Sequence, residues 1–193
     1  MIADDARVES GATVGEHTFV WYRAHIRAGA TIGTGCVIGS NAFIDTDVTV
    51  GDLSKIQNSA QIFAPATLGN GVFVGPGAIL TNDRNPRAVN PDLTKQTGED
   101  WDAGGVSVDN GASIGAGAVI VAGVKVGEWA LIGAGAIVTR DVLCHELVAG
   151  NPARHIGWVG RDGRRLASDG DHWVDDAGLR YESTAQGLAE VGR

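Results

Sequence analysis

The residues best placed to do chemistry lie where an otherwise regular pattern of the chain stops. Asn82 and Asp83 follow soon after Leu80, the last position of that pattern. A neighbouring amide and carboxylate could orient a polar group and accept its proton. The same two residue types also favour an Asx turn, in which the side chain bonds to nearby backbone and begins a loop. The sequence leaves both interpretations open for this candidate catalytic pair.

Further polar side chains extend the candidate site. Arg84 and Arg87 could bind a substrate's phosphate groups, because the guanidinium group makes bidentate contacts with phosphate oxygens. Gln57 and Asn58 end an earlier strand of the pattern, where their side chains could project from a corner toward a substrate. A structural ladder of stacked asparagines is the competing explanation for these two residues.

His25 is a third catalytic candidate. It precedes Ile26, which occupies an inward position of the pattern, so His25 lies on an outer wall or at a corner. A histidine there could serve as a general base, since its ordinary pKa lies near neutral pH. A structural or interface role is the alternative.

The pattern that positions these residues has a period of six. Stepping by six from Val8 to Leu80 meets an aliphatic residue at all thirteen positions, and the register resumes, shifted, from Val108 to Val138. Glycine often follows the aliphatic residue, which we attribute to a corner whose backbone geometry a Cβ would strain. Three hexapeptides would close a triangular coil of 18 residues, and coils would stack about 4.8 Å apart through parallel strands. The chain is therefore predicted to be an all-β parallel β-helix.

Two segments depart from the pattern. Residues 83–107 contain no hexapeptide register, and a loop of this length in a compact domain is usually functional, although a tolerated insertion is the alternative. Residues 1–158 are interpreted as the β-helix, and residues 159–193, rich in Asp, Arg and Gly, as a C-terminal extension or cap. Alternating residues around 164–175 predict a hairpin, and a helix is expected near 184–191.

Composition excludes several classes of protein. The 193 residues carry a formal net charge of −8, which argues against nucleic acid as a partner. Apolar stretches are too short to cross a membrane, and the N-terminus shows no secretory signal. Cys36 and Cys144 fall in the repeats, so we expect two buried or half-buried thiols in a reducing, cytoplasmic setting.

The sequence resembles the hexapeptide-repeat acyltransferases over roughly residues 5–158, most closely the enzymes that N-acetylate a 3-amino group of UDP- or dTDP-linked sugars in bacterial surface-glycan pathways. The motifs that carry this resemblance are Val20-Trp21 with His25-Ile26, Lys55-Ile-Gln-Asn58, Gly71-Val-Phe-Val-Gly-Pro-Gly77, Thr81-Asn82-Asp83 and Asn85-Pro86-Arg87. The segment Gly150-Asn-Pro-Ala-Arg154 is shared more widely. One departure concerns Phe63 and Ala64, where that branch often has a tyrosine and a carboxylate.

The resemblance implies a left-handed winding and a homotrimer with active sites between neighbouring prisms. Acetyl-CoA would lie in the groove between prisms and the nucleotide-linked amino sugar under the loop. Small residues would let the pantetheine approach the backbone, and an arginine near the cap would meet the CoA phosphates. The residues assigned to this cofactor site are Ala118, Gly133, Ala134, Ala136 and Arg154.

Within this resemblance, Asn82 and Asp83 would hold the amine as it attacks the thioester directly. A strong general base is less necessary for an amine than for a hydroxyl acceptor. An O-acetyltransferase with a histidine base and a non-catalytic hexapeptide scaffold remain alternatives. No metal is expected, because the histidines lack the spacing of the zinc-dependent γ-type carbonic anhydrases of this fold.

Overall fold

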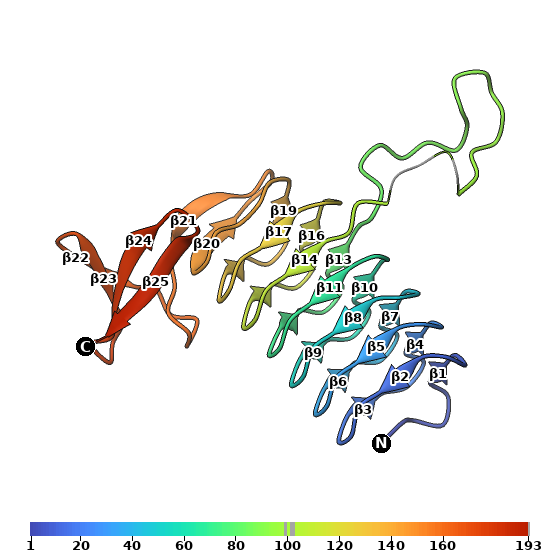
Figure 1. The fold of residues 1–193 in the computed structure, drawn as a ribbon, viewed down its shortest axis with the longest axis horizontal. Coiled ribbons are helices and arrows are strands. Elements are labelled where there is room, and N and C mark those ends of the chain that lie inside the picture. Colours follow the sequence, from blue (N-terminus) through green and yellow to red (C-terminus); the bar gives the residue numbers. More distant parts are fainter. Residues whose placement is uncertain (99, 101–102, 193) are drawn as a thin grey trace.

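A computed structural model describes residues 1–98, 100 and 103–192. Most of the chain forms a three-sided solenoid whose coils stack in chain order (Figure 1). Nineteen strands of two residues build it. They are β1 Arg7–Val8, β2 Thr13–Val14, β3 Phe19–Val20, β4 His25–Ile26, β5 Thr31–Ile32, β6 Val37–Ile38, β7 Phe43–Ile44, β8 Thr49–Val50, β9 Lys55–Ile56, β10 Gln61–Ile62, β11 Thr67–Leu68, β12 Phe73–Val74, β13 Ile79–Leu80, β14 Ser107–Val108, β15 Ser113–Ile114, β16 Val119–Ile120, β17 Lys125–Val126, β18 Leu131–Ile132 and β19 Ile137–Val138.

The strands form three parallel sheets, which are the walls of the solenoid. Wall A has the order β3-β6-β9-β12-β15-β18, wall B β1-β4-β7-β10-β13-β16-β19, and wall C β2-β5-β8-β11-β14-β17. Val8 pairs with Ile26, and Ile26 with Ile44, so each coil takes 18 residues. The predicted hexapeptide β-helix is confirmed, and its form is consistent with a left-handed winding.

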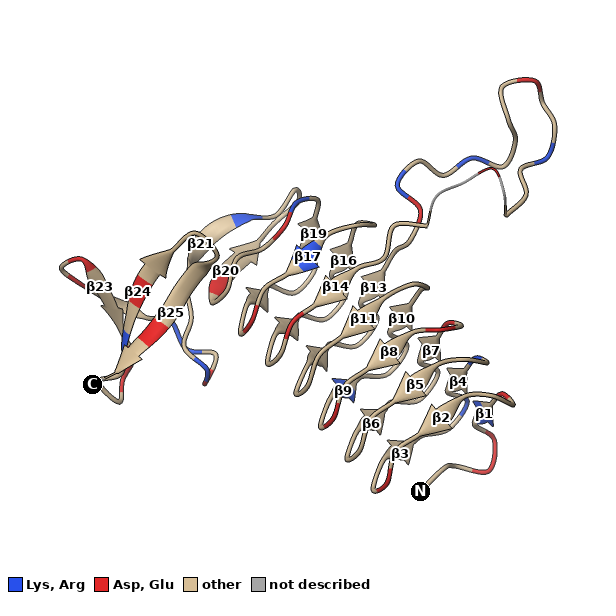
Figure 2. Ribbon diagram, viewed as in Figure 1, with Lys and Arg blue, Asp and Glu red and all other residues tan. Residues whose placement is uncertain are grey.

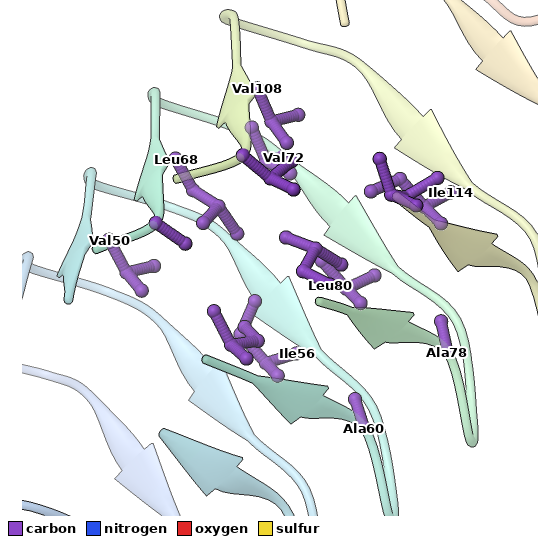
Figure 3. Packing of buried hydrophobic residues seen from close by; sticks show 14 of the residues in the cluster. Val50, Ile56, Ala60, Leu68, Val72, Ala78, Leu80, Val108 and Ile114 are labelled. Atoms are coloured by element: carbon purple, nitrogen blue, oxygen red, sulfur yellow. The ribbon is translucent and has the colours of Figure 1, made fainter. Parts of the chain in front are cut away.

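Two columns of side chains fill the solenoid, rather than the single one that the sequence predicted. The aliphatic residue of each strand points inward, and so does a smaller residue two positions before it (Figure 3). Ala60 with Ile62 and Ala78 with Leu80 illustrate the pairing, and all four are fully buried. The alternation of small and large residues lets neighbouring coils approach closely.

The glycines after the aliphatic residues have a different cause from the one predicted. Gly39 and Gly115 do not adopt positive φ angles. A Cβ on Gly115 would instead lie 2.5 Å from the Ala134 backbone nitrogen of the next coil. The left-handed position falls two residues later in the hexapeptide, where both Gly117 and Leu53 have positive φ. Close stacking of coils therefore selects the first glycine, because no side chain fits between the backbones.

The long loop is an insertion between two coils that otherwise stack normally. Thr67 on wall C pairs with Ser107, 40 residues later, instead of the usual 18. The chain leaves wall B after Leu80, at the corner between walls B and C, and projects away from the solenoid (Figure 1). Inside the loop, Val89 and Lys95 form an isolated antiparallel bridge.

The C-terminal part closes the top of the solenoid. β20 (Glu146–Ala149) continues wall A and pairs antiparallel with β21 (Arg154–Trp158). β22 (Ala167–Asp169), β23 (His172–Val174), β24 (Arg180–Thr184) and β25 (Gly187–Gly192) then form an antiparallel sheet with a small core of its own. The expected hairpin is confirmed.

The helix expected near residues 184–191 is wrong. This segment ends β24, turns, and runs as β25, which pairs with β24 from Thr184↔Gly187 to Arg180↔Gly192. Its Leu, Ala and Glu residues favour a helix locally, but pairing with a neighbouring strand overrides such weak preferences.

The described residues include no helix with the length and hydropathy that crossing a membrane requires.

Both cysteines have the burial that the repeats predicted, and neither is in a disulfide. Cys36 is buried between Thr18 and Ser54 of the adjacent coils. Its backbone nitrogen donates to the Thr18 hydroxyl over 3.0 Å. Burial raises the pKa of the Cys36 thiol, so this residue is a core group rather than a nucleophile.

Candidate active site at the base of the inserted loop

The first residues of the loop are bonded to the coils on both sides. The Thr81 hydroxyl donates to the Ile120 carbonyl over 3.1 Å and accepts from the Ala122 backbone nitrogen over 2.9 Å. On the other side, Asn82 Nδ2 donates to the Ala64 carbonyl over 2.7 Å. Asn82 and Ala64 are 18 residues apart, so this bond joins equivalent positions of neighbouring coils. These bonds fix the direction in which the loop leaves the solenoid.

Asp83 and Arg84 continue this anchorage. Asp83 Oδ1 accepts from the Asn85 backbone nitrogen over 2.9 Å, which is an Asx turn. The Arg84 guanidinium donates to the Ala122 carbonyl from Nε over 3.2 Å and from Nη2 over 2.8 Å. The Arg84 side chain is thus bonded to the backbone of the next coil. The exposed Arg87 donates to the adjacent Pro86 carbonyl and to no other described residue.

Two acceptor atoms remain at the loop base. Neither Asn82 Oδ1 nor Asp83 Oδ2 accepts a hydrogen bond from any described residue. Both side chains are half-buried. The turn and a functional role are therefore compatible, since one oxygen of Asp83 forms the turn and the other stays available to a ligand's N–H group.

His25 lies on wall B but not beside the loop. The register His25↔Phe43↔Gln61↔Ile79 places it three coils below the last strand before the loop. At about 4.8 Å per coil, this is a separation of roughly 14 Å along the solenoid. Within one chain, the structure does not bring His25 together with Asn82 and Asp83.

A carboxylate partner holds the His25 ring. Nε2 lies 2.8 Å from Glu9 Oε1, while Glu9 Oε2 accepts from the Ala28 backbone nitrogen over 3.1 Å. The hydrogen bond to His25, followed by that to Ala28, lowers the pKa of the Glu9 carboxyl. Sequence reasoning missed Glu9, although the register places it one coil below Arg27, next to His25.

Gln57 and Asn58 lie on the opposite edge of wall B, at the corner with wall A. Asn58 Oδ1 accepts from the Ser40 backbone nitrogen over 3.0 Å. Asp52, Asn70 and Asn110 make the same bond to the coil below at the corner between walls C and A. These contacts favour the structural-ladder explanation for Asn58.

The residues assigned to CoA divide into two groups. Ala118 and Ala136 are both 0% exposed, because they occupy the second inward column. Their methyl groups face the core, so only their backbone atoms could contact a pantetheine chain, and their assignment to CoA stays a prediction. Gly133 and Ala134 lie at the corner between walls A and B, where Gly133 is half-buried and Ala134 is exposed. Arg154 on β21 is also exposed, and the neighbouring Ala153 bonds to Ile137 of wall B.

A pocket of about 490 Å³ lies elsewhere, where the top of the solenoid meets β25. The sequence does not predict this pocket, because the pairing of Cys144 with Gly187 depends on how the C-terminal sheet folds onto the solenoid. His145 lines the pocket, and its Nδ1 lies 2.9 Å from the Val159 carbonyl. Burial lowers the pKa of His145.

No group of three or more metal-binding side chains occurs in the described part of the chain.

Two family models match the repeats. The model described as "Bacterial transferase hexapeptide (six repeats)" covers residues 11–46, and "Hexapeptide repeat of succinyl-transferase" covers residues 29–64 and 105–140. The matched segments carry the hexapeptide repeat of bacterial transferases. Its inserted loop begins between the two segments that the second model matches. No curated protein sequence matches the chain.

Solved structures of acetyltransferases are similar to much of this chain. A variant of perosamine N-acetyltransferase from Caulobacter crescentus, in complex with CoA and GDP-perosamine, is 27% identical over 81% of this chain, with a TM-score of 0.51. The chain spans 55% of that protein's length. A hexapeptide-repeat acetyltransferase from Vibrio cholerae, complexed with acetyl-CoA, is 22% identical over 68% of this chain and 72% of its own, with a TM-score of 0.58. At that identity, the second likeness supports the fold alone.

Proposed function

We propose that this chain is an acetyl-CoA-dependent N-acetyltransferase that acylates the amino group of a nucleotide-linked amino sugar. The observation that carries the proposal is the loop base, where Asn82 and Asp83 keep one acceptor oxygen each on a hexapeptide-repeat prism. The 27% identity to perosamine N-acetyltransferase, whose structure holds CoA and GDP-perosamine, supports it. It also adds GDP to UDP and dTDP as a candidate nucleotide.

The loop base suits direct attack of an amine on the thioester. Asn82 Oδ1 and Asp83 Oδ2 would accept the two N–H groups of the amine and aim its lone pair at the acetyl carbonyl. The C–N bond forms, the C–S bond breaks, and the proton lost by nitrogen passes through Asp83 to the CoA thiolate. Since His25 lies roughly 14 Å lower in the same chain, it could act as a base only in a site built between two chains.

We propose a homotrimer as the assembly that completes the site. The outer face of wall B carries a half-buried apolar column that includes Ile79, Val119 and Ile137, whereas wall C carries threonines such as Thr31 and Thr49. An apolar face of this kind favours contact with another chain. In such an assembly, the corner of one prism that carries Gly133 and Ala134 could face the inserted loop of its neighbour. Light scattering would measure the mass.

The test is mass spectrometry of reactions with acetyl-CoA and UDP-, dTDP- and GDP-linked amino sugars. An amide product that is reduced by Asn82→Ala and Asp83→Asn, but not by the exposed control Asn85→Ala, supports the proposal. No acylated sugar together with no CoA binding in calorimetry would leave the scaffold alternative. An ester product cleaved by hydroxylamine would instead support O-acetylation, which the His25–Glu9 pair favours.

A further inference from the structure

Three aromatic rings form a continuous ladder on wall B below the loop. The His25 and Phe43 ring centroids lie 5.6 Å apart, and those of Phe43 and Phe63 also lie 5.6 Å apart. All three residues are half-buried, so ring surface remains accessible. Phe63 immediately precedes Ala64, whose carbonyl holds Asn82. The ring ladder, defined as His25, Phe43 and Phe63, therefore runs from the loop base toward the N-terminal coils.

Ionisable side chains accompany the ring ladder at its lower end. Glu9 is held by His25, and Arg7 Nη2 lies 3.4 Å from its Oε1. Arg27 Nη1 contacts Asp45 Oδ1 over 2.7 Å. Figure 2 shows charged residues in these N-terminal coils and in the loop, with few on the strands between them. Glu9 Oε2 accepts from the Ala28 nitrogen and has a second lone pair for another N–H donor. At Oε1, which His25 holds, a ligand N–H would replace the exposed Arg7 side chain.

The other two walls lack this combination. Wall C presents threonines at the outward position of β2, β5, β8 and β11. On wall A, Phe19 and Phe73 are separated by the coils of Val37 and Lys55, so their rings are not adjacent. Contacting rings beside a carboxylate thus occur on the wall from whose edge the loop leaves. Packing alone would not require that coincidence.

We propose that the ring ladder and Glu9 form the subsite for the base of the sugar nucleotide. This inference rests on the proposed function. With the amine at Asn82, a base against His25 and Phe43 lies two to three coils lower, about 10–14 Å away, a span that an extended nucleoside diphosphate bridges. The Phe43 ring supplies the stacking surface, and stacking on an aromatic side chain is a strong contribution to base binding.

The carboxylate of Glu9 gives the subsite a base preference. Guanine presents two adjacent N–H donors, N1–H and the N2 amino group, which match the two oxygens of a carboxylate. Uracil and thymine present one N–H between two carbonyl oxygens, which the Glu9 charge repels. The subsite therefore favours a guanosine diphosphate sugar over its uridine and thymidine counterparts.

Competition by nucleoside monophosphates tests the subsite. GMP, UMP and dTMP are titrated into the wild type, Phe43→Leu, Glu9→Gln and the matched control Phe73→Leu, which changes an outward phenylalanine on wall A. We expect GMP to bind most tightly, Phe43→Leu to weaken it about tenfold, and Phe73→Leu to leave it unchanged. Glu9→Gln should remove the preference for GMP over UMP.

Three results would overturn the subsite. The first is that Phe43→Leu and Phe73→Leu bind GMP with equal affinity. The second is that the wild type binds UMP as tightly as GMP. The third is that Phe43→Leu changes the mass of the assembly, which would make the ring ladder a subunit contact. Acetylation assays on the same variants separate this outcome from failure of the proposed function. Normal acetylation of a nucleotide sugar with no effect of Phe43→Leu refutes the subsite alone, whereas GMP selectivity without any acetylation refutes the function alone.

Discussion

Two glycines of one turn should lose different amounts of stability when each is changed to alanine. Gly115→Ala places a methyl group 2.5 Å from the Ala134 nitrogen and 2.7 Å from its Cα. Gly117→Ala, two residues later, meets nothing within 4 Å but requires an alanine at a φ of +66°. The first substitution tests the stacking of coils and the second tests the conformation of the corner.

The expected magnitudes differ by a factor of about three. The atoms that meet the new Cβ of Gly115→Ala belong to backbone, so the two coils must separate, and overpacking of this kind costs about 3 kcal/mol. A left-handed alanine at position 117 costs about 1–2 kcal/mol, and the reduced freedom of the unfolded chain offsets part of this, which leaves a net cost of about 1 kcal/mol. Leu53 and Ser59 already adopt positive φ at equivalent corners, which shows that a side chain is tolerated there.

Thermal unfolding followed by circular dichroism measures the difference. At about 2–4 °C per kcal/mol for a chain of this size, Gly115→Ala should lower Tm by roughly 6–12 °C and Gly117→Ala by about 2–4 °C. Equal shifts, or a larger shift for Gly117→Ala, would refute close coil stacking as the reason for the first glycine.

Three further predictions concern the loop base and the cap. Arg84→Met should lower kcat/KM several-fold with little change in Tm, because it removes the two hydrogen bonds to Ala122 that anchor the loop; Lys95→Met in the exposed loop tip is the control. Asn82→Ala should lower kcat/KM by about tenfold to a hundredfold through loss of an oriented acceptor, and an unchanged value would remove it from the site. Burial lowers the pKa of His145, so the unfolded chain binds its proton more readily, and the free energy of unfolding should fall as pH drops below about 6.5. His145→Gln should flatten that dependence in urea titrations at pH 5 and pH 8, and an equally steep fall in the variant would contradict the assignment.

The repeat made the solenoid predictable, but only in part. The step of six from Val8 to Leu80 predicts the strands because each aliphatic residue must be buried. The second inward column is not predictable from the sequence, because alanine is common in turns as well as in cores, and Ala118 and Ala136 fit either position. The segment 184–191 is not predictable from its composition, because pairing of β25 with the neighbouring strand β24 outweighs the local preference for a helix.

The candidate site was predictable where it depends on the coil period. That period alone places Ala64 beneath Asn82, as the hydrogen bond between them confirms. The same arithmetic separates His25 from the loop. By contrast, the turn of the Arg84 side chain toward Ala122 depends on how an insertion re-enters the solenoid, which no spacing encodes.

The coil period also sets the distances between sites along the solenoid. The distance from Glu9 to the loop base depends on how many coils lie between them, since every coil adds the same rise and returns to the same wall. Removing or duplicating one 18-residue coil below the loop would therefore change the reach of this edge by about 4.8 Å without turning any outward residue away. In such a fold, whole coils gained or lost would tune the length of ligand accommodated, while point substitutions would tune its chemistry.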